Sequence, residues 1–296
     1  MREGVLILGP AGWGEFSPFR EYDDAEAASW WRAAREAADD GWPPSVRTQV
    51  PVNATVPAVS PVDVAGVLAR FPGCTTAKVK VAAAGQSPAQ DEDRLRAVRD
   101  ALGPGGRIRV DANGAWGVER AISLLPRYDR AAGGLEYAEQ PCKTTEELAA
   151  ARRKLDIPIA ADESIRRTGD PLRVASREAA DVAVLKVQPL GGVRACLRIA
   201  EQIGLPVVVS SALETSVGIA AGVALAAALP ELPYACGLAT VGLLAQDVVD
   251  DPLVAVDGAL PVRRPIPSET KLAAVRADEP TSIWWTDRIS RVQQRS

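Results

Sequence analysis

The sequence predicts a closed α/β barrel of parallel strands with a small capping unit made from both ends of the chain. Three observations support this. From about residue 46 to residue 245, short apolar or β-branched runs alternate with helical stretches, which is typical of βα units around a parallel sheet. The first 45 residues and those after residue 245 break this pattern. Polar residues stand at the ends of the runs, where the loops of a barrel open.

The predicted strands are eight short runs in regular alternation with helices, which favours closure into a barrel. Ala, Leu, Arg and Glu fill the segments between them, so we expect helices at 88–102, 144–155 and 192–204. An open doubly wound sheet would give the same alternation, but no GxGxxG or GxxxxGKS/T turn follows the first strand. The strands are predicted at 51–58, 76–82, 107–113, 134–141, 157–164, 182–189, 205–214 and 231–238.

The chain divides into three expected segments. Residues 1–45 would form the N-terminal part of the cap, as a glycine-broken hairpin followed by an amphipathic helix with an acidic start and a glycine stop. Residues 46–245 would form the barrel, and residues 246–296 would complete the cap. The total length of 296 residues suits one barrel of roughly 200 to 250 residues with a smaller second unit.

Composition narrows the possible partners. The net charge of −4, with no Lys and Arg cluster among aromatics, predicts binding neither to nucleic acid nor to a membrane surface. The four cysteines form no CxxC pair, which argues against disulfides or a thiolate zinc site and for the reducing cytoplasm. The apolar run near Met1 is far below the roughly 20 residues of a spanning helix, so we expect neither export nor an anchor. We therefore expect a small-molecule partner, bound by a monomer or weak homo-oligomer.

The chain has no histidine, which excludes a Ser-His-Asp triad, a Cys-His pair and a histidine-bound metal, so any proton transfer falls to Lys, Asp, Glu, Tyr or Cys. Lys78 and Lys80 lie two apart on one predicted strand, so both side chains point to the same face. A solvated strand edge would explain that spacing about equally well. Lys186 is harder to explain in this way, because a lone lysine inside an apolar parallel strand is costly to bury without a partner.

Carboxylates end the strands that lie between these lysines. Asp111 is followed two residues later by Asn113, although an Asx turn leaving a strand is the commoner reason for this pattern. Glu139 would have a simple alternative role as a strand-end carboxylate in water. Asp162 and Glu163 would equally serve as caps of the next helix.

The order of these residues is more specific than any one of them. Strands two to six present Lys-x-Lys, Asp, Glu, Asp and Lys in turn, so three carboxylates lie between amines at the barrel mouth. Clustered carboxylates repel one another unless a cation lies among them, and an all-oxygen site suits Mg²⁺. Such an ion would hold a substrate carboxylate and stabilise the charge that develops when an alpha proton leaves. A neighbouring ammonium and the metal would favour the neutral amine of Lys80, which the base must be.

Six motifs carry a resemblance to a known family. AKVKV, RVDANGAW, YAEQPCK, ADES, LKVQPLGG and VVSSALETSVG together resemble the enolase superfamily, and most closely its o-succinylbenzoate synthase family of menaquinone biosynthesis. The resemblance runs from about residue 3 to residue 265. It implies a (β/α)7β TIM-like barrel with an α+β cap drawn from both termini. Relative to the family pattern, the segment before the barrel is expected to be shortened.

The resemblance also implies roles for the candidate residues. Asp111, Glu139 and Asp162 would bind Mg²⁺, for which Mn²⁺ would be a substitute, while Lys80 would abstract the proton and Lys186 would stabilise the enediolate. The implied reaction is syn dehydration of 2-succinyl-6-hydroxy-2,4-cyclohexadiene-1-carboxylate to 2-succinylbenzoate, by a hydro-lyase. Lys78 is expected to join Lys80 and Lys186 as a third catalytic lysine. The residues expected around the substrate or behind the site are Arg109, Asn113, Glu163, Ser210, Ser211, Glu214 and Gly191, and Gly191 and Gly192 would let a substrate carboxylate approach a helix N-terminus.

Two other functions remain open at this point. An N-acylamino acid racemase or dipeptide epimerase would use the same scaffold, with Lys80 and Lys186 exchanging a proton from opposite faces. A barrel that binds a ligand without catalysis is a remoter alternative, because all five core positions carry the residue types that the chemistry requires.

Overall fold

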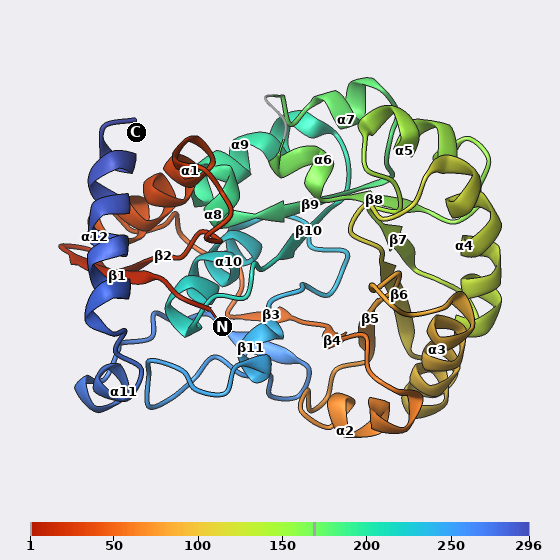
Figure 1. The fold of residues 1–296 in the computed structure, drawn as a ribbon, viewed down its shortest axis with the longest axis horizontal. Helices are drawn as coiled ribbons and strands as arrows, with labels where there is room; N and C mark the ends of the chain where they lie inside the picture. Colours follow the sequence, from red (N-terminus) through yellow and green to blue (C-terminus); the bar gives the residue numbers. More distant parts are fainter. Residues whose placement is uncertain (1, 168–169, 296) are drawn as a thin grey trace.

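The centre of the molecule is a curled sheet of seven parallel strands. A computed structural model describes residues 2–167 and 170–295. The strands follow one another in chain order across the sheet, and helices cover its outer face (Figure 1). This order is what repeated βα units produce. The strands are β4 (Ala54–Val56), β5 (Thr76–Lys80), β6 (Arg107–Asp111), β7 (Tyr137–Glu139), β8 (Ile159–Ala161), β9 (Val182–Lys186) and β10 (Val207–Ser210).

The barrel is closed by residues 234–238, within the segment predicted as the last strand. Cys236 and Gly237 form isolated parallel bridges to Val52 and Ser210, which lie at the two edges of the sheet. The predicted α/β barrel class is therefore confirmed. Its eighth element makes single bridges rather than a regular strand.

The first predicted strand, 51–58, is divided in the structure. Its start belongs to β3 (Gln49–Pro51), which pairs antiparallel with β11 (Ala259–Pro261) beside the barrel, and β4 alone enters the main sheet. Proline has no backbone N–H to give to a ladder, so Pro51 and Pro57 mark the ends of these short strands.

Local sequence signals explain where the outer helices begin. Helix α3 (Pro88–Leu102) starts at a capping box made by Ser87 and Gln90, with a proline at its first position.

Helix α10 (Ser216–Ala228) is apolar and buried along almost its whole length. Even so, none of the described helices is both long and apolar enough to cross a membrane. The other barrel helices are α2 (Val64–Leu68), α4 (Val118–Ala132), α5 (Thr145–Arg152), α6 (Glu163–Arg166), α7 (Arg173–Ser176), α8 (Val187–Leu190) and α9 (Val193–Ile203), with 3-10 turns η2 (Pro61–Asp63) and η3 (Ala239–Leu243).

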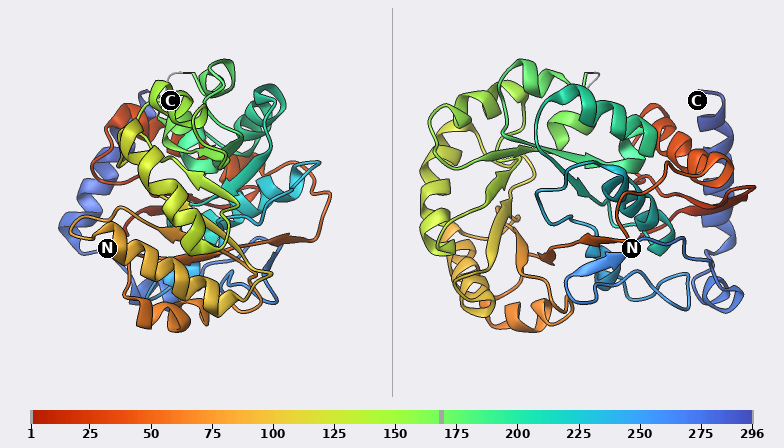
Figure 2. Two further views of the ribbon diagram at one scale, coloured as in Figure 1. Left: turned by 90° about the vertical axis from the view of Figure 1, so that its right-hand side faces the viewer. Right: turned by 180° about the vertical axis from the view of Figure 1, so that it is seen from behind.

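Both ends of the chain form the cap. Figure 2 shows helices from the two termini side by side at one side of the barrel. Their shared core is aromatic, with the ring of Phe16 edge-on to Trp31 at 5.5 Å and to Trp285 at 5.8 Å. The cap elements are the hairpin β1 (Val5–Gly9) and β2 (Gly12–Phe16), α1 (Asp24–Arg35), the π-helical turn η1 (Glu36–Asp40), and α11 (Glu269–Ala274) and α12 (Glu279–Gln293).

Candidate active site

Strand register brings the predicted residues to one end of the barrel. Lys80 lies opposite Asp111 in the β5–β6 ladder, and Asp111 lies opposite Glu139 in the β6–β7 ladder. Asp162 directly follows β8, and Lys186 is the last residue of β9. Parallel strands in register put residues at their carboxyl ends on one rim, and these side chains share it for that reason.

Lys78 and Lys80 contact the carboxylates of Asp111 and Glu139 directly. The Nζ of Lys78 lies 2.9 Å and 3.0 Å from the two carboxylate oxygens of Glu139, and 3.3 Å from Oδ2 of Asp111. The Nζ of Lys80 donates to Oδ2 of Asp111 at 2.6 Å and to Oδ1 of Asn113 at 2.9 Å. Lys78 is buried, whereas the side chain of Lys80 is 34% exposed. Lys80 is therefore the more accessible of the two amines.

Asp162 lies between two further cations. Its Oδ2 accepts a hydrogen bond from Nζ of Lys186 at 2.7 Å, and its Oδ1 accepts one from Nε of Arg166 at 2.8 Å. The Arg166 guanidinium also donates to Oε1 of Glu163 at 2.7 Å and to the hydroxyl of Tyr22 at 2.9 Å. Because Tyr22 belongs to the cap, this loop of the barrel is held against the cap.

The buried charges shift one another's proton affinity. Burial alone would lower the pKa of Lys78, but the negative charges of Glu139 and Asp111 outweigh it and raise the pKa, so this amine stays charged. Burial would raise the pKa of Asp111, but Lys80 and Lys78 hold it below its usual value. Burial would likewise raise the pKa of Asp162, and Lys186 and Arg166 lower it. For Glu139, burial and repulsion by Asp111 raise the pKa to about 7.

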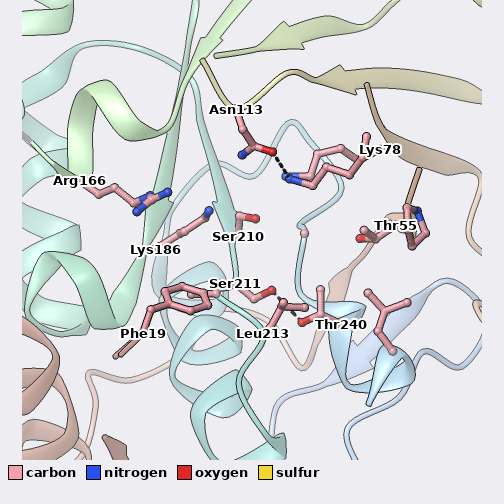
Figure 3. A pocket seen from close by; sticks show the side chains of 15 residues that line it. Phe19, Thr55, Lys78, Asn113, Arg166, Lys186, Ser210, Ser211, Leu213 and Thr240 are labelled. Carbon is pink, nitrogen blue, oxygen red and sulfur yellow. Dashed lines mark hydrogen bonds between the residues drawn. The ribbon is translucent and has the colours of Figure 1, made fainter. Parts of the chain in front are cut away.

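A cavity of about 320 Å³ lies above these residues. Figure 3 shows Lys186 and Arg166 on one side of it and Lys78 on the other. Within the described chain, the charged side chains that line it are all cations, which suits a carboxylate ligand. The lining residues are Phe19, Thr55, Pro57, Lys78, Lys80, Asn113, Arg166, Lys186, Ser210, Ser211, Ala212, Leu213, Gly237, Thr240 and Leu243.

Three of the predicted substrate residues line the cavity, and a fourth lies behind it. Asn113, Ser210 and Ser211 line the cavity. Glu163 lies behind it, paired with Arg166 and accepting from the amide of Asn113 at 3.3 Å.

Glu214 and Arg109 are buried away from the cavity lining. Glu214 accepts a hydrogen bond from the N–H of Ala212 at 2.7 Å, and burial raises its pKa. The guanidinium of Arg109 donates to Glu136, to Asn53 at 3.2 Å and to the carbonyl of Ala235 at 2.7 Å in the barrel interior. Its hydrogen bonds are thus with this interior network, behind the site.

The expectation for Gly191 and Gly192 needs correction. A Cβ at Gly191 would meet Arg32 of the cap at 3.5 Å, so this residue faces helix α1. The N-terminus of α9 is already bound by the Glu36 carboxylate, which accepts hydrogen bonds from the N–H groups of Val193 and Arg194. A cap side chain, and not a substrate carboxylate, therefore satisfies these N–H groups.

Sequence reasoning missed Arg166 and the cap residue Phe19. Arg166 follows Asp162 by four residues on a helical turn, a spacing that brings the two side chains together and that would have been a usable signal. Phe19 follows the cap hairpin and reaches the cavity only because the cap packs on the barrel. No local pattern in the sequence marks it.

The residues at the rim fit a hard divalent cation. Asp111, Glu139 and Asp162 offer only carboxylate oxygens, which such ions prefer. Lys78 already places one positive charge within 3.3 Å of both Asp111 and Glu139, so this position stabilises a cation. Among the described residues, no group of three Asp, Glu, His or Cys side chains is arranged as metal ligands. Each rim carboxylate is instead paired with an amine or a guanidinium.

Comparisons with known proteins agree with this geometry. Residues 64–266 match the family described as enolase C-terminal domain-like, and residues 1–38 match the enolase N-terminal domain-like family. Among solved structures, muconate cycloisomerase from Pseudomonas fluorescens is 22% identical, with a TM-score of 0.75 over 94% of this chain and 98% of that one. Dipeptide epimerase from Enterococcus faecalis V583 is 22% identical, with a TM-score of 0.73 over 89% of this chain and 92% of that one. These two likenesses show the fold.

Sequence relatives define the family more closely. The o-succinylbenzoate synthase of Thermobifida fusca (strain YX) is 66% identical over 94% of this chain and 87% of that protein. The o-succinylbenzoate synthase of Mycolicibacterium smegmatis is 56% identical over 98% of this chain and 88% of that protein. Enolase superfamily members use divalent metal ions, in agreement with the carboxylate rim. Identity of this degree over nearly the whole chain shows that the chain belongs to the o-succinylbenzoate synthase family of the enolase superfamily.

Proposed function

We propose that this chain is a hydro-lyase that catalyses the Mg²⁺-dependent syn dehydration of 2-succinyl-6-hydroxy-2,4-cyclohexadiene-1-carboxylate to 2-succinylbenzoate in menaquinone biosynthesis. One observation carries the assignment of roles. Lys80 and Lys186 end β5 and β9 and line one cavity, and a carboxylate ends or directly follows each of the three strands between them. An alpha proton of a substrate bound there would lie between a base and a second amine.

Lys80 takes the proton alpha to the ring carboxylate. Its accessible amine then returns this proton to the hydroxyl that leaves from the neighbouring carbon, so that the C–H and C–O bonds break, water departs and the ring becomes aromatic. Lys186 lines the cavity across from Lys78 (Figure 3), so it would face the other side of the substrate ring, where its ammonium would stabilise the negative charge that develops on the carboxylate. Removal and return of the proton by one base on one face make the elimination syn.

The carboxylates would hold the metal. Asp111, Glu139 and Asp162 are its proposed ligands, with Lys78 and Arg166 balancing their charge from the sides. When bound, Mg²⁺, or Mn²⁺ as a substitute, supplies positive charge that orients the substrate carboxylate and stabilises the charge developing on it. The ammonium of Lys78 keeps Glu139 and Asp111 in place through its contacts with both.

The remaining lining of the cavity suits the succinyl arm. Ser210, Ser211 and Asn113 offer hydrogen-bonding groups, while Phe19 and Leu243 provide apolar surface. We infer that the enzyme acts in the cytoplasm as a monomer or weak homo-oligomer, without a nucleic acid or membrane partner. The free state of Cys74, Cys142, Cys196 and Cys236 supports a reducing location.

The test follows ultraviolet absorbance as the cyclohexadiene becomes aromatic. With Mg²⁺ present, we expect Lys80→Ala to lower kcat by about 10²- to 10⁴-fold, because the base is lost. Glu139→Gln removes one proposed metal ligand, so activity should fall and the Mg²⁺ requirement should rise. Excess chelator should abolish turnover. Wild-type rates in Lys80→Ala, or full activity in chelator, would remove the proposed mechanism.

Racemisation of N-acylamino acids, or epimerisation of dipeptides, is the second candidate, because both lysines line the same cavity. Incubating N-succinyl amino acids with the enzyme in D₂O would reveal racemisation in two ways. The optical rotation would be lost, and deuterium would be incorporated at the alpha carbon. Racemisation together with dehydration would add a second activity. Racemisation without dehydration would replace the proposal.

A further inference from the structure

A buried ion pair lies outside the cavity, on the helix that follows β5. Asp91 and Arg94 of α3 are each 1% exposed, and their side chains form a salt bridge. Neither residue lines the cavity. Burying a guanidinium is costly unless its N–H groups are satisfied, so the partners of Arg94 indicate what the pair does.

Arg94 links two loops of the barrel rim. Its Nη1 donates to the carbonyl of Val59 at 2.9 Å, and its Nη2 donates to the carbonyl of Lys80 at 3.1 Å. Val59 lies in the loop after β4, two residues beyond Pro57, which lines the cavity. One side chain therefore holds the backbone of a cavity wall and the backbone of Lys80 at a set separation.

Asp91 holds the chain on the other side of Lys80. Its Oδ2 accepts hydrogen bonds from the N–H of Ala82 at 3.0 Å and from the hydroxyl of Tyr128 at 2.9 Å. Ala82 has φ of +60°, in the left-handed region that residues with a Cβ rarely adopt. The turn that follows Lys80 thus keeps a conformation that the neighbouring side chains must stabilise.

Lys80 needs such support because its own side chain is flexible. Its four-carbon side chain is partly exposed, and only the terminal amine forms hydrogen bonds, with Asp111 and Asn113. The position of the other end of the side chain is therefore set by the backbone of Lys80. A shift of about 1 Å in a reacting group lowers the rate by about 100-fold. We propose that Arg94 is a positioning residue that places Lys80 for proton abstraction, an inference that rests on Lys80 being the base in the proposed function.

Arg99 provides a matched control on the same helix. Its guanidinium also binds backbone carbonyls, those of Ala132 at 2.6 Å and of Gly103 and Gly106 at 2.7 Å each. These contacts lie at the C-terminal end of α3, away from the rim. Arg94→Met and Arg99→Met therefore remove the same kind of bond from one helix, the first from contacts with the rim loops and the second from contacts at the C-terminal end of the helix.

The experiment measures kcat, KM and the isotope effect on kcat with substrate deuterated at the carbon that loses its proton. Both variants should lower Tm. At a temperature where circular dichroism shows both folded, Arg94→Met should lower kcat by about 10- to 100-fold, with KM within about threefold of wild type. Its deuterium isotope effect should rise, because proton abstraction becomes slower than the other steps. Arg99→Met should keep kcat within about twofold and leave the isotope effect unchanged.

Arg94→Lys serves as the conservative variant and decides the matter if Arg94→Met does not fold. Lysine keeps the charge beside Asp91 but offers one nitrogen for two carbonyls, so kcat should fall between wild type and Arg94→Met, again with a raised isotope effect. If kcat and the isotope effect in the Arg94 variants match those of Arg99→Met, the inference is overturned. A wild-type enzyme without dehydratase activity would instead overturn the proposed function.

Discussion

At the scale of single residues, Glu15 shows how much one buried carboxyl can contribute outside the catalytic rim. It extends from β2 of the cap to the N-terminus of α10, where it accepts hydrogen bonds from the N–H groups of Thr215 at 3.2 Å and Gly218 at 3.0 Å. Ser17 also donates to it, at 2.6 Å. Burial nevertheless outweighs these donors, and together with the nearby charge of Glu214 it raises the pKa of Glu15 to about 7.

This shift predicts a pH dependence of stability. The folded pKa lies above the ordinary value of 4.5, so the contribution of Glu15 is fully present below about pH 4.5 and is lost as pH rises through about 7. The loss amounts to about 3 kcal/mol at 1.36 kcal/mol per unit. Glu15→Gln should therefore gain unfolding free energy relative to wild type between pH 5 and pH 8, measured by urea denaturation.

The comparison between the two proteins isolates this residue, because all other titrating groups are shared. Glu214, whose pKa burial also raises, will leave some slope in the variant. Parallel pH profiles for wild type and Glu15→Gln would show that Glu15 titrates normally in the folded protein.

At the scale of elements, α3 shows how a helix start serves the rim of the barrel. Ser87 and Gln90 close a capping box at its N-terminus, and the next turn carries Asp91 and Arg94 toward the loop after β5. This capping box satisfies N–H groups that have no partner within the helix. The position of the first turn, and hence of the buried pair, depends on it.

Ser87→Ala should therefore lower the unfolding free energy by about 1 kcal/mol, because the side-chain acceptor for the N–H of Gln90 is lost. Thermal or urea unfolding would measure this loss. Ser87→Asp keeps an acceptor at the same place and is expected to remain close to wild type. Equal destabilisation by both substitutions would show that the hydroxyl does more than cap the helix.

At the scale of the whole molecule, two glutamates of the cap bind the starts of two successive barrel helices. Glu15 contacts the N-terminus of α10, and Glu36 contacts the N-terminus of α9. Neither carboxylate comes from the helix it satisfies. Each carboxyl group accepts hydrogen bonds from N–H groups that have no partner within the helix, and in this way joins the cap to the barrel. For Glu36, the partial positive charge of the helix end adds to this contact.

Glu36→Ala should weaken this docking. Loss of charged hydrogen bonds to Val193 and Arg194 predicts a fall of about 1.5 to 3 kcal/mol in unfolding free energy. KM should rise more than kcat falls, because the cap residue Phe19 lines the cavity. Urea denaturation and steady-state kinetics would measure both.

Glu26→Ala is the matched control, since Glu26 also belongs to the cap and contacts the barrel. Its partner is the exposed Arg167, at 3.1 Å, and a surface pair of this kind contributes about 0 to 1 kcal/mol. If Glu26→Ala raises KM as much as Glu36→Ala does, the two contacts are equivalent. The hydrogen bonds of Glu36 to the N-terminus of α9 would then not be what positions the cap on the barrel.

Periodicity and motif spacing predicted most of the scaffold, as the strand ends show. Lys80, Asp111, Glu139, Asp162 and Lys186 stand at or directly after successive strand ends in both the sequence and the structure. The division of the first strand into β3 and β4 was not predicted. It depends on pairing with β11, more than 200 residues later in the chain, which local pattern does not reveal.

The sequence by itself determined the barrel, the order of charged residues around its rim and the absence of histidine from its chemistry, because these follow from local alternation and composition. The tertiary structure decided which cavity those residues share, that Arg166 and Phe19 join them, and that Glu36 takes the helix end expected to meet the substrate. The physical reason is that these contacts join segments far apart in the chain. They form only when the cap and the barrel pack together.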